Sequence, residues 1–105
     1  RDPANVVVVV EGPLDALKID YYGRQFGISA IATMGTAVTD GQRMSLANIA
    51  KKTRTYVLFD VGAEAQSLRL ADEIGARWLS LPFGIKDPGE MDQKTVTEFL
   101  QKMVK

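Results

Sequence analysis

Five consecutive valines, Val6–Val10, followed by Glu11, Gly12 and Pro13, constrain the fold of this chain more than any other stretch. An unbroken apolar run lacks the alternation of a half-solvated strand and favours a strand covered on both faces, as in a parallel sheet between helices. β-Branched side chains lose rotamer freedom in a helix, and Gly12-Pro13 supplies a turn and a suitable first helical residue. Glu11 is therefore predicted at the carboxyl end of a buried strand, the edge where open α/β sheets bind ligands.

The rest of the chain alternates between helix and strand patterns. Apolar spacing predicts a helix over 13–25 from Leu14, Leu17 and Tyr21, a helix over 42–52 capped near Thr39, a helix over 64–74 ended by Gly75 with Ala65, Leu68 and Ala71 in register, and a closing helix marked by Val96, Phe99, Leu100, Met103 and Val104. Short apolar runs predict buried strands at 28–33, 55–60 and 77–81.

Strands and helices that alternate in this way imply right-handed βαβ units. We therefore expect an α/β fold, with a mostly parallel four-stranded sheet and helices on both faces, in a single domain spanning residues 1–105. The length of 105 residues fits one compact core, and the strand order is not given by the sequence.

Composition narrows the chemistry. The 13 basic and 13 acidic residues cancel, so no net charge steers the chain onto nucleic acid or a membrane surface. The absence of Cys and His excludes disulfides, thiol and imidazole catalysis and the usual zinc sites, which leaves carboxylates with Mg²⁺ or Mn²⁺. The valine run is too short to cross a bilayer and no signal peptide precedes it, so we expect a cytoplasmic protein with no membrane partner, and the start at Arg1 suggests a piece of a longer one.

Three carboxylates stand at turns next to predicted strand ends: Glu11, Asp60 and Asp87. Asp15 lies about one helical turn after Glu11 and can face the same crevice. Carboxylates gathered without a counter-charge repel one another, and a divalent cation is the economical way to hold them together at neutral pH. The sequence thus predicts a magnesium site at this edge, with Glu11, Asp60 and Asp87 as ligands.

Each of these acids also has a purely structural interpretation. Glu11 and Asp15 could interact with the positive end of the helix that begins at Pro13, Asp60 could cap the next helix, and Asp87 begins an ordinary turn. The basic cluster Lys51, Lys52 and Arg54 is better explained as a solvated helix end than as a phosphate track, and Tyr21, Tyr22 and Trp78 are better explained by packing than by base stacking. No dinucleotide fingerprint or P-loop occurs, so no nucleotide cofactor is expected and a flavodoxin-like small-ligand domain is disfavoured.

The motifs together resemble a Toprim domain, the catalytic α/β module of topoisomerases, bacterial-type primases and related nucleases. Val9–Asp15 resembles the family's first motif, a strand that ends in Glu and Gly with an Asp further on. Leu58–Asp60 resembles the entry to its Asp-x-Asp motif. Ala32–Ala37 and Pro82–Glu90 resemble the second-strand exit and the Lys-Asp-Pro segment of the primase branch.

The resemblance implies a primase-like domain of a DNA-replication or mobile-element protein, in which Mg²⁺ or Mn²⁺ serves nucleotidyl transfer on a DNA template. It implies acid/base or metal roles for Glu11 and a metal role for Asp60. Asp15 and Asp87 match acidic pocket positions of primases, with Gly12, Glu64 and Glu90 as secondary pocket residues. DNA, nucleotides and other domains of the same protein are the implied partners.

The sequence departs from the family pattern at two positions. Gly62 stands where the second aspartate of Asp-x-Asp belongs, and Gly89 stands where primases often carry another acid. A catalytically degenerate nucleic-acid-binding or metal-binding module, or a Toprim nuclease, therefore remains an alternative. Fewer ligands predict weak binding of the ion, strengthened by Gly62→Asp if the backbone at Gly62 tolerates a side chain.

Overall fold

The computed structural model describes residues 6–35 and 37–104, so Thr36 of the second motif lies outside the described residues. A four-stranded parallel sheet has the order β2-β1-β3-β4. Its strands are β1 (Val6–Val10), β2 (Ile28–Ala32), β3 (Arg54–Val57) and β4 (Arg77–Trp78). The expected parallel α/β sheet is confirmed.

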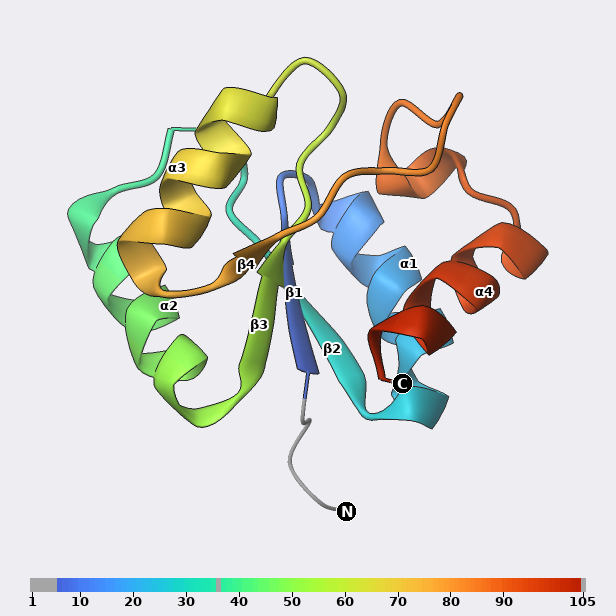
Figure 1. The fold of residues 1–105 in the computed structure, drawn as a ribbon, viewed down its shortest axis with the longest axis horizontal. Coiled ribbons are helices and arrows are strands. Elements are labelled where there is room, and N and C mark those ends of the chain that lie inside the picture. Colours follow the sequence, from blue (N-terminus) through green and yellow to red (C-terminus); the bar gives the residue numbers. More distant parts are fainter. Residues whose placement is uncertain (1–5, 36, 105) are drawn as a thin grey trace.

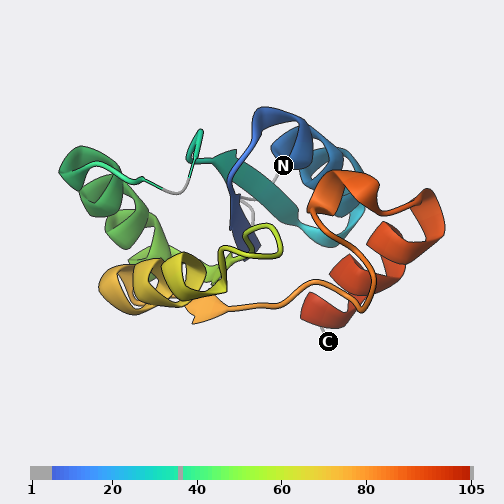
Figure 2. The ribbon, with the colours of Figure 1, turned by 90° about the horizontal axis from the view of Figure 1, so that it is seen from above.

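Two pairs of helices enclose the sheet. The helices are α1 (Pro13–Gly23), α2 (Asp40–Lys52), α3 (Glu64–Ile74) and α4 (Gln93–Met103), with short 3₁₀ turns η1 (Arg24–Phe26) and η2 (Pro88–Glu90). Helices α1 and α4 cover one face and α2 and α3 cover the other, as Figures 1 and 2 show from two directions. None of the helices in the described ranges is long and apolar enough to cross a membrane.

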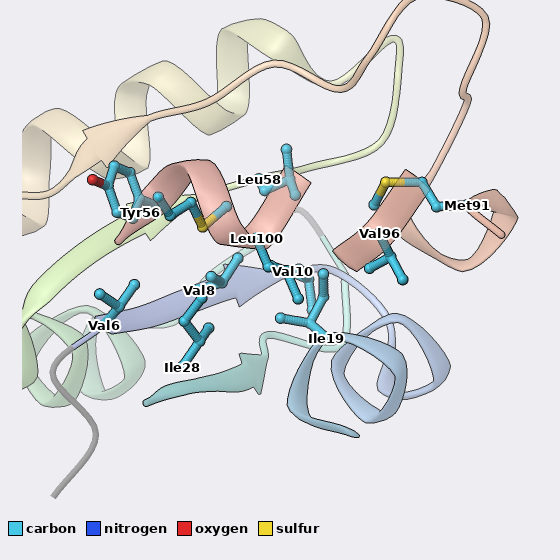
Figure 3. Packing of buried hydrophobic residues seen from close by; sticks show 11 residues of the cluster. Val6, Val8, Val10, Ile19, Ile28, Tyr56, Leu58, Met91, Val96 and Leu100 are labelled. Atoms are coloured by element: carbon cyan, nitrogen blue, oxygen red, sulfur yellow. The ribbon is translucent and has the colours of Figure 1, made fainter. Parts of the chain in front are cut away.

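The valine strand lies at the centre and is buried on both faces. Val8 and Val10 pack into a cluster with Ile19 of α1 and Leu100 of α4 (Figure 3). Val9 points to the opposite cluster, which α2 and α3 complete. Each fully buried valine contributes about 1.5–3 kcal/mol relative to an exposed one, so β1 is anchored from both sides.

The prediction of a fourth buried strand over 77–81 is wrong in length and burial. Strand β4 contains only Arg77 and Trp78, both exposed, at the edge of the sheet. The chain leaves the sheet after Leu79, whose N–H donates to the Val57 carbonyl at 3.0 Å. Leu79 and Leu81 then pack toward the cluster under α4, which draws the segment away from the ladder.

The predicted helices are present, but the sequence misassigned part of their buried faces. Leu14, Leu17 and Tyr21 of α1 are exposed, whereas Ile19 and Gly23 are buried. The reason is close packing on β2: a Cβ at Gly23 would lie 2.8 Å from the Ile28 Cβ.

The same happens in α3, where the face centred on Leu70 is buried and Leu68 and Ala65 are exposed. The predicted caps are confirmed. Thr39 forms a capping box with Gln42, and Gly75 ends α3 in a left-handed conformation.

Candidate functional site

The strand order creates a crevice at the carboxyl ends of β1 and β3. These strands are neighbours, but the chain leaving β1 enters α1 on one face and the chain leaving β3 enters α3 on the other. In α/β sheets such a switch point is where ligands bind. Glu11 follows β1 directly and Asp60 lies three residues after β3. The Asp60 N–H donates to Glu11 Oε1 at 2.8 Å, so the two acids meet at one edge, as the sequence predicts.

A cleft of about 560 Å³ opens beside this pair. Besides Asp60 it is lined by Gly12, Pro13, Leu14, Asp15, Lys18, Asp87, Gly89 and Glu90. We call this region, together with Glu11, the acidic cleft. Asp15 comes from α1 and Asp87 from the turn before η2, so residues far apart in the sequence converge here.

Two of the secondary residues have other partners. The carboxylate of Glu64 accepts the Gly62 N–H at 3.0 Å, and Glu64 does not line the cleft. Glu90 lines the cleft, but its Oε1 accepts the Lys86 N–H at 2.8 Å. These two acids therefore brace their own loops.

Asp60 carries the strongest electrostatic signature. Its Oδ1 atom is buried and has no hydrogen-bond partner among the described residues. Burial, and then the charges of Glu11, Asp15 and Asp87, raise the pKa of Asp60 from its ordinary value of 3.8 to about 6. No Lys or Arg within residues 6–35 and 37–104 forms an ion pair with these four carboxylates. These four carboxylates thus concentrate negative charge at the cleft without a salt-bridge partner among the described residues.

Asp15 shows the same effect in a milder form. Burial raises its pKa, the hydrogen bond from the Gly89 N–H opposes that rise, and the charges of Asp87 and Glu11 add to it. The Gly89 N–H donates to Asp15 Oδ1 at 2.8 Å. A Cβ at Gly89 would lie 2.9 Å from that same oxygen and 3.1 Å from Asp87 Oδ1. A side chain at this position would therefore push against the Asp15 and Asp87 carboxylates.

The acids do not form a ready-made cage. In the part of the chain that the structure describes, no three Asp or Glu side chains are grouped closely enough to hold a metal ion. The basic cluster lies elsewhere. Lys51 and Lys52 end α2 and Arg54 begins β3, so the cluster lies at the amino end of a strand, away from the carboxyl ends where the acids gather. The Arg54 guanidinium donates to the Met103 carbonyl at 2.9 Å. The predicted role of the cluster as a solvated helix end agrees with this position.

Sequence reasoning missed Lys18. It lines the acidic cleft, and its ammonium donates to the carbonyls of Gly89 and Met91. The available signal was its spacing of three residues from Asp15 on the same helix, which brings both side chains to one face.

The fold is that of a known class. No family model matches this sequence, and no curated protein matches it. A solved structure of a small TOPRIM domain protein from Bacillus stearothermophilus superposes with a TM-score of 0.70, covering 98% of this chain and 87% of that chain at 18% identity. The chain therefore has a Toprim-like fold, as the sequence predicts.

The raised pKa of Asp60 predicts a stability that depends on pH. Because the folded-state pKa lies above the unfolded value, the folded protein binds the Asp60 proton more tightly than the unfolded chain does. The contribution of Asp60 to stability is therefore most favourable at low pH and is lost as the pH rises from about 4 to about 6. In metal-free buffer at pH 7, Asp60→Asn should raise the free energy of unfolding by about 1–2 kcal/mol, a value reduced for partial solvent exposure. Urea titrations between pH 4 and pH 7 measure this.

Asp72→Asn, which removes an exposed carboxylate of α3 outside the cleft, is the matched control and should not reproduce the gain in stability at pH 7. Asp15 titrates in the same direction, so Asp60→Asn should keep a smaller decline. A decline as steep as that of the parent would contradict the assignment to Asp60.

Gly62 does not meet the condition under which Gly62→Asp is predicted to strengthen ion binding. Its φ is +100°, a conformation that L side chains rarely adopt. Gly62→Asp should therefore lower the free energy of unfolding by about 1–2 kcal/mol, measured by urea denaturation in the absence of metal. Gly41→Asp is the control: it makes the same change in the first turn of α2, where nothing lies within 4 Å of the added Cβ, and should cost nothing. Equal stabilities of the two variants would show that position 62 accepts a side chain.

Proposed function

We propose that this chain is a primase-like Toprim domain whose acidic cleft holds Mg²⁺ or Mn²⁺ for nucleotidyl transfer on a DNA template. The observation that carries the proposal is the Glu11–Asp60 pair at the switch point, where Asp60 has a buried, unpartnered oxygen and a pKa raised by burial and then by three neighbouring acids. The Toprim-like fold and the primase-type segments at 32–37 and 82–90 support it.

The donor set fits a hard cation that keeps much of its water. Mg²⁺ sites of phosphoryl-transfer enzymes use one or two carboxylates together with waters and substrate phosphates. Asp60 Oδ1 and Glu11 would provide the protein oxygens, with Asp87 and Asp15 adding negative charge around them. This agrees with the lack of a three-acid cage among the described residues. When bound, the ion would neutralise charge that develops on a transferring phosphoryl group.

The chain's own residues set up this arrangement. Glu11 accepts the Asp60 N–H and so fixes the exit of β3 against the exit of β1. With a pKa of about 6, Asp60 is mainly ionised at pH 7 and available as a ligand. Leu14 and Pro13 line the cleft beside Asp15, so part of its wall is apolar and could lie against a nucleotide substrate.

A second candidate is a metal-binding module without catalysis. Gly62 has the positive φ that disfavours a side chain, at the position where the resemblance expects an acidic ligand. A two-ion mechanism relies on carboxylates that bridge ions roughly 4 Å apart, so one missing ligand weakens it. On this alternative the cleft would bind an ion and nucleic acid but would not join nucleotides.

Metal affinity tests both candidates against a purely structural cleft. Calorimetric titration of the parent with Mn²⁺ should show weak binding, and Asp60→Asn and Glu11→Gln should each weaken it at least about tenfold, or about 1.4 kcal/mol. Asp72→Asn removes the same charge from α3 and should bind as the parent does. Binding that is undiminished in Asp60→Asn would place the ion elsewhere.

Primer synthesis separates the two candidates. The isolated chain, supplied with single-stranded template, nucleotides and Mn²⁺, should make no primers, because a net charge of zero gives it little grip on DNA. A fusion to a sequence-independent single-strand-binding domain raises the effective template concentration. Primers made by the fusion and lost with Asp60→Asn would support the catalytic candidate. Metal binding without primers would support the binding module, and primers from the unfused chain would contradict the expectation.

A further inference from the structure

Helix α1 holds the backbone of Gly89 with two side chains. Lys18 Nζ donates to the Gly89 carbonyl at 2.8 Å and to the Met91 carbonyl at 2.7 Å. Asp15 Oδ1 accepts the Gly89 N–H at 2.8 Å. Both backbone polar groups of Gly89 are therefore bonded to side chains one helical turn apart on α1, across more than 70 positions of sequence. We call this arrangement the Gly89 clamp.

Lys18 uses its donors on carbonyls although acids surround it. It lines the cleft together with Asp15, Asp60 and Asp87, yet no ion pair joins it to any carboxylate in the described ranges. An ammonium in an acidic cleft would ordinarily pair with a carboxylate, since charged partners make the stronger hydrogen bonds. Its contacts instead tie a turn to a helix, which is a positioning task.

The position of this turn decides where the Asp87 carboxylate lies. Asp87 Oδ1 accepts the Glu90 N–H at 3.1 Å, so the carboxylate moves with the turn. Pro88 and Met91 are buried and anchor one side of the turn in the core. On the other side, toward the cleft, the described polar contacts to α1 are those of the Gly89 clamp.

We propose that Lys18 is a positioning residue of the acidic cleft: it holds the Asp87–Met91 turn against α1, and through the placement of Asp87 it strengthens the binding of a divalent cation. The statement about affinity rests on the proposed function. The statement about the turn does not, because it concerns contacts within the chain.

The sign of the effect separates positioning from simple charge. Lys18 carries a positive charge beside the cleft, so by Coulomb's law its removal alone would strengthen the binding of a cation. Loss of a positioning contact acts in the opposite direction. Side chains that lie around the ligands of a metal site, the place proposed for Asp87, typically account for about 10–100-fold in metal affinity.

Lys18→Met keeps most of the side-chain length and removes the donors and the charge. Mn²⁺ affinity should fall about tenfold, and exchange of the Gly89 amide proton, followed by NMR, should become several-fold faster. Lys18→Arg keeps charge and donors and should restore most of both properties. Lys51→Met removes the same charge at the opposite edge of the sheet and should leave both as in the parent.

The outcomes distinguish the two proposals. Unchanged or tighter Mn²⁺ binding by folded Lys18→Met, with binding intact in the parent, would overturn the role of Lys18 and leave the proposed function standing. A parent that binds no Mn²⁺ would end the proposed function instead. The exchange rate of the Gly89 amide proton would then decide whether Lys18 holds the turn. Faster exchange in Lys18→Met, but not in Lys18→Arg or Lys51→Met, would support the clamp, and an unchanged rate in Lys18→Met would overturn it.

Discussion

Strand β1 is covered by helices on both faces and paired with a strand on each side, and the rest of the molecule follows from this constraint. Strand β1 pairs with β2 and β3, so its backbone groups are satisfied within the sheet, and helix pairs cover its valines from either side. The exits are fixed too: the N–H groups of Thr33 and Leu58 donate to the carbonyls of Val10 and Val9 at 2.9 and 2.8 Å. Glu11, the next residue, therefore has its backbone position set by the sheet.

This rigidity has an electrostatic cost. Parallel strands end at a common edge, so the acids that follow β1 and β3 are brought together, and Asp15 and Asp87 add to the repulsion. Backbone N–H groups that donate to Glu11 and Asp15 lower that cost, and the pKa of Asp60 is raised. Four carboxylates that gather at one edge with no salt bridge to a Lys or Arg of the described residues are typical of a binding site. The proposed ion would relieve the repulsion that the sheet imposes.

The contrast between local and tertiary determinants explains what could be predicted from the sequence. The Thr39 capping box and the left-handed Gly75 depend on a few adjacent residues, and the shared edge of Glu11 and Asp60 follows from parallel strand geometry alone. The buried face of α1 depends on the approach of Gly23 to Ile28, which the helical spacing of Leu14 and its neighbours does not encode.

The short β4 and the Gly89 clamp could not be predicted from the sequence either, because each depends on a partner that is distant in the chain.

The two glycines that depart from the family pattern have separate physical explanations. Gly62 has a backbone conformation that L side chains rarely adopt, whereas a side chain at Gly89 would push against two carboxylates. In each case the glycine N–H donates to a carboxylate, of Glu64 and of Asp15 respectively. The two N–H groups differ in what they stabilise, because Glu64 does not line the cleft whereas Asp15 does. The Gly89 N–H therefore offsets part of the repulsion among the cleft carboxylates, since its hydrogen bond opposes the rise that burial causes in the pKa of Asp15.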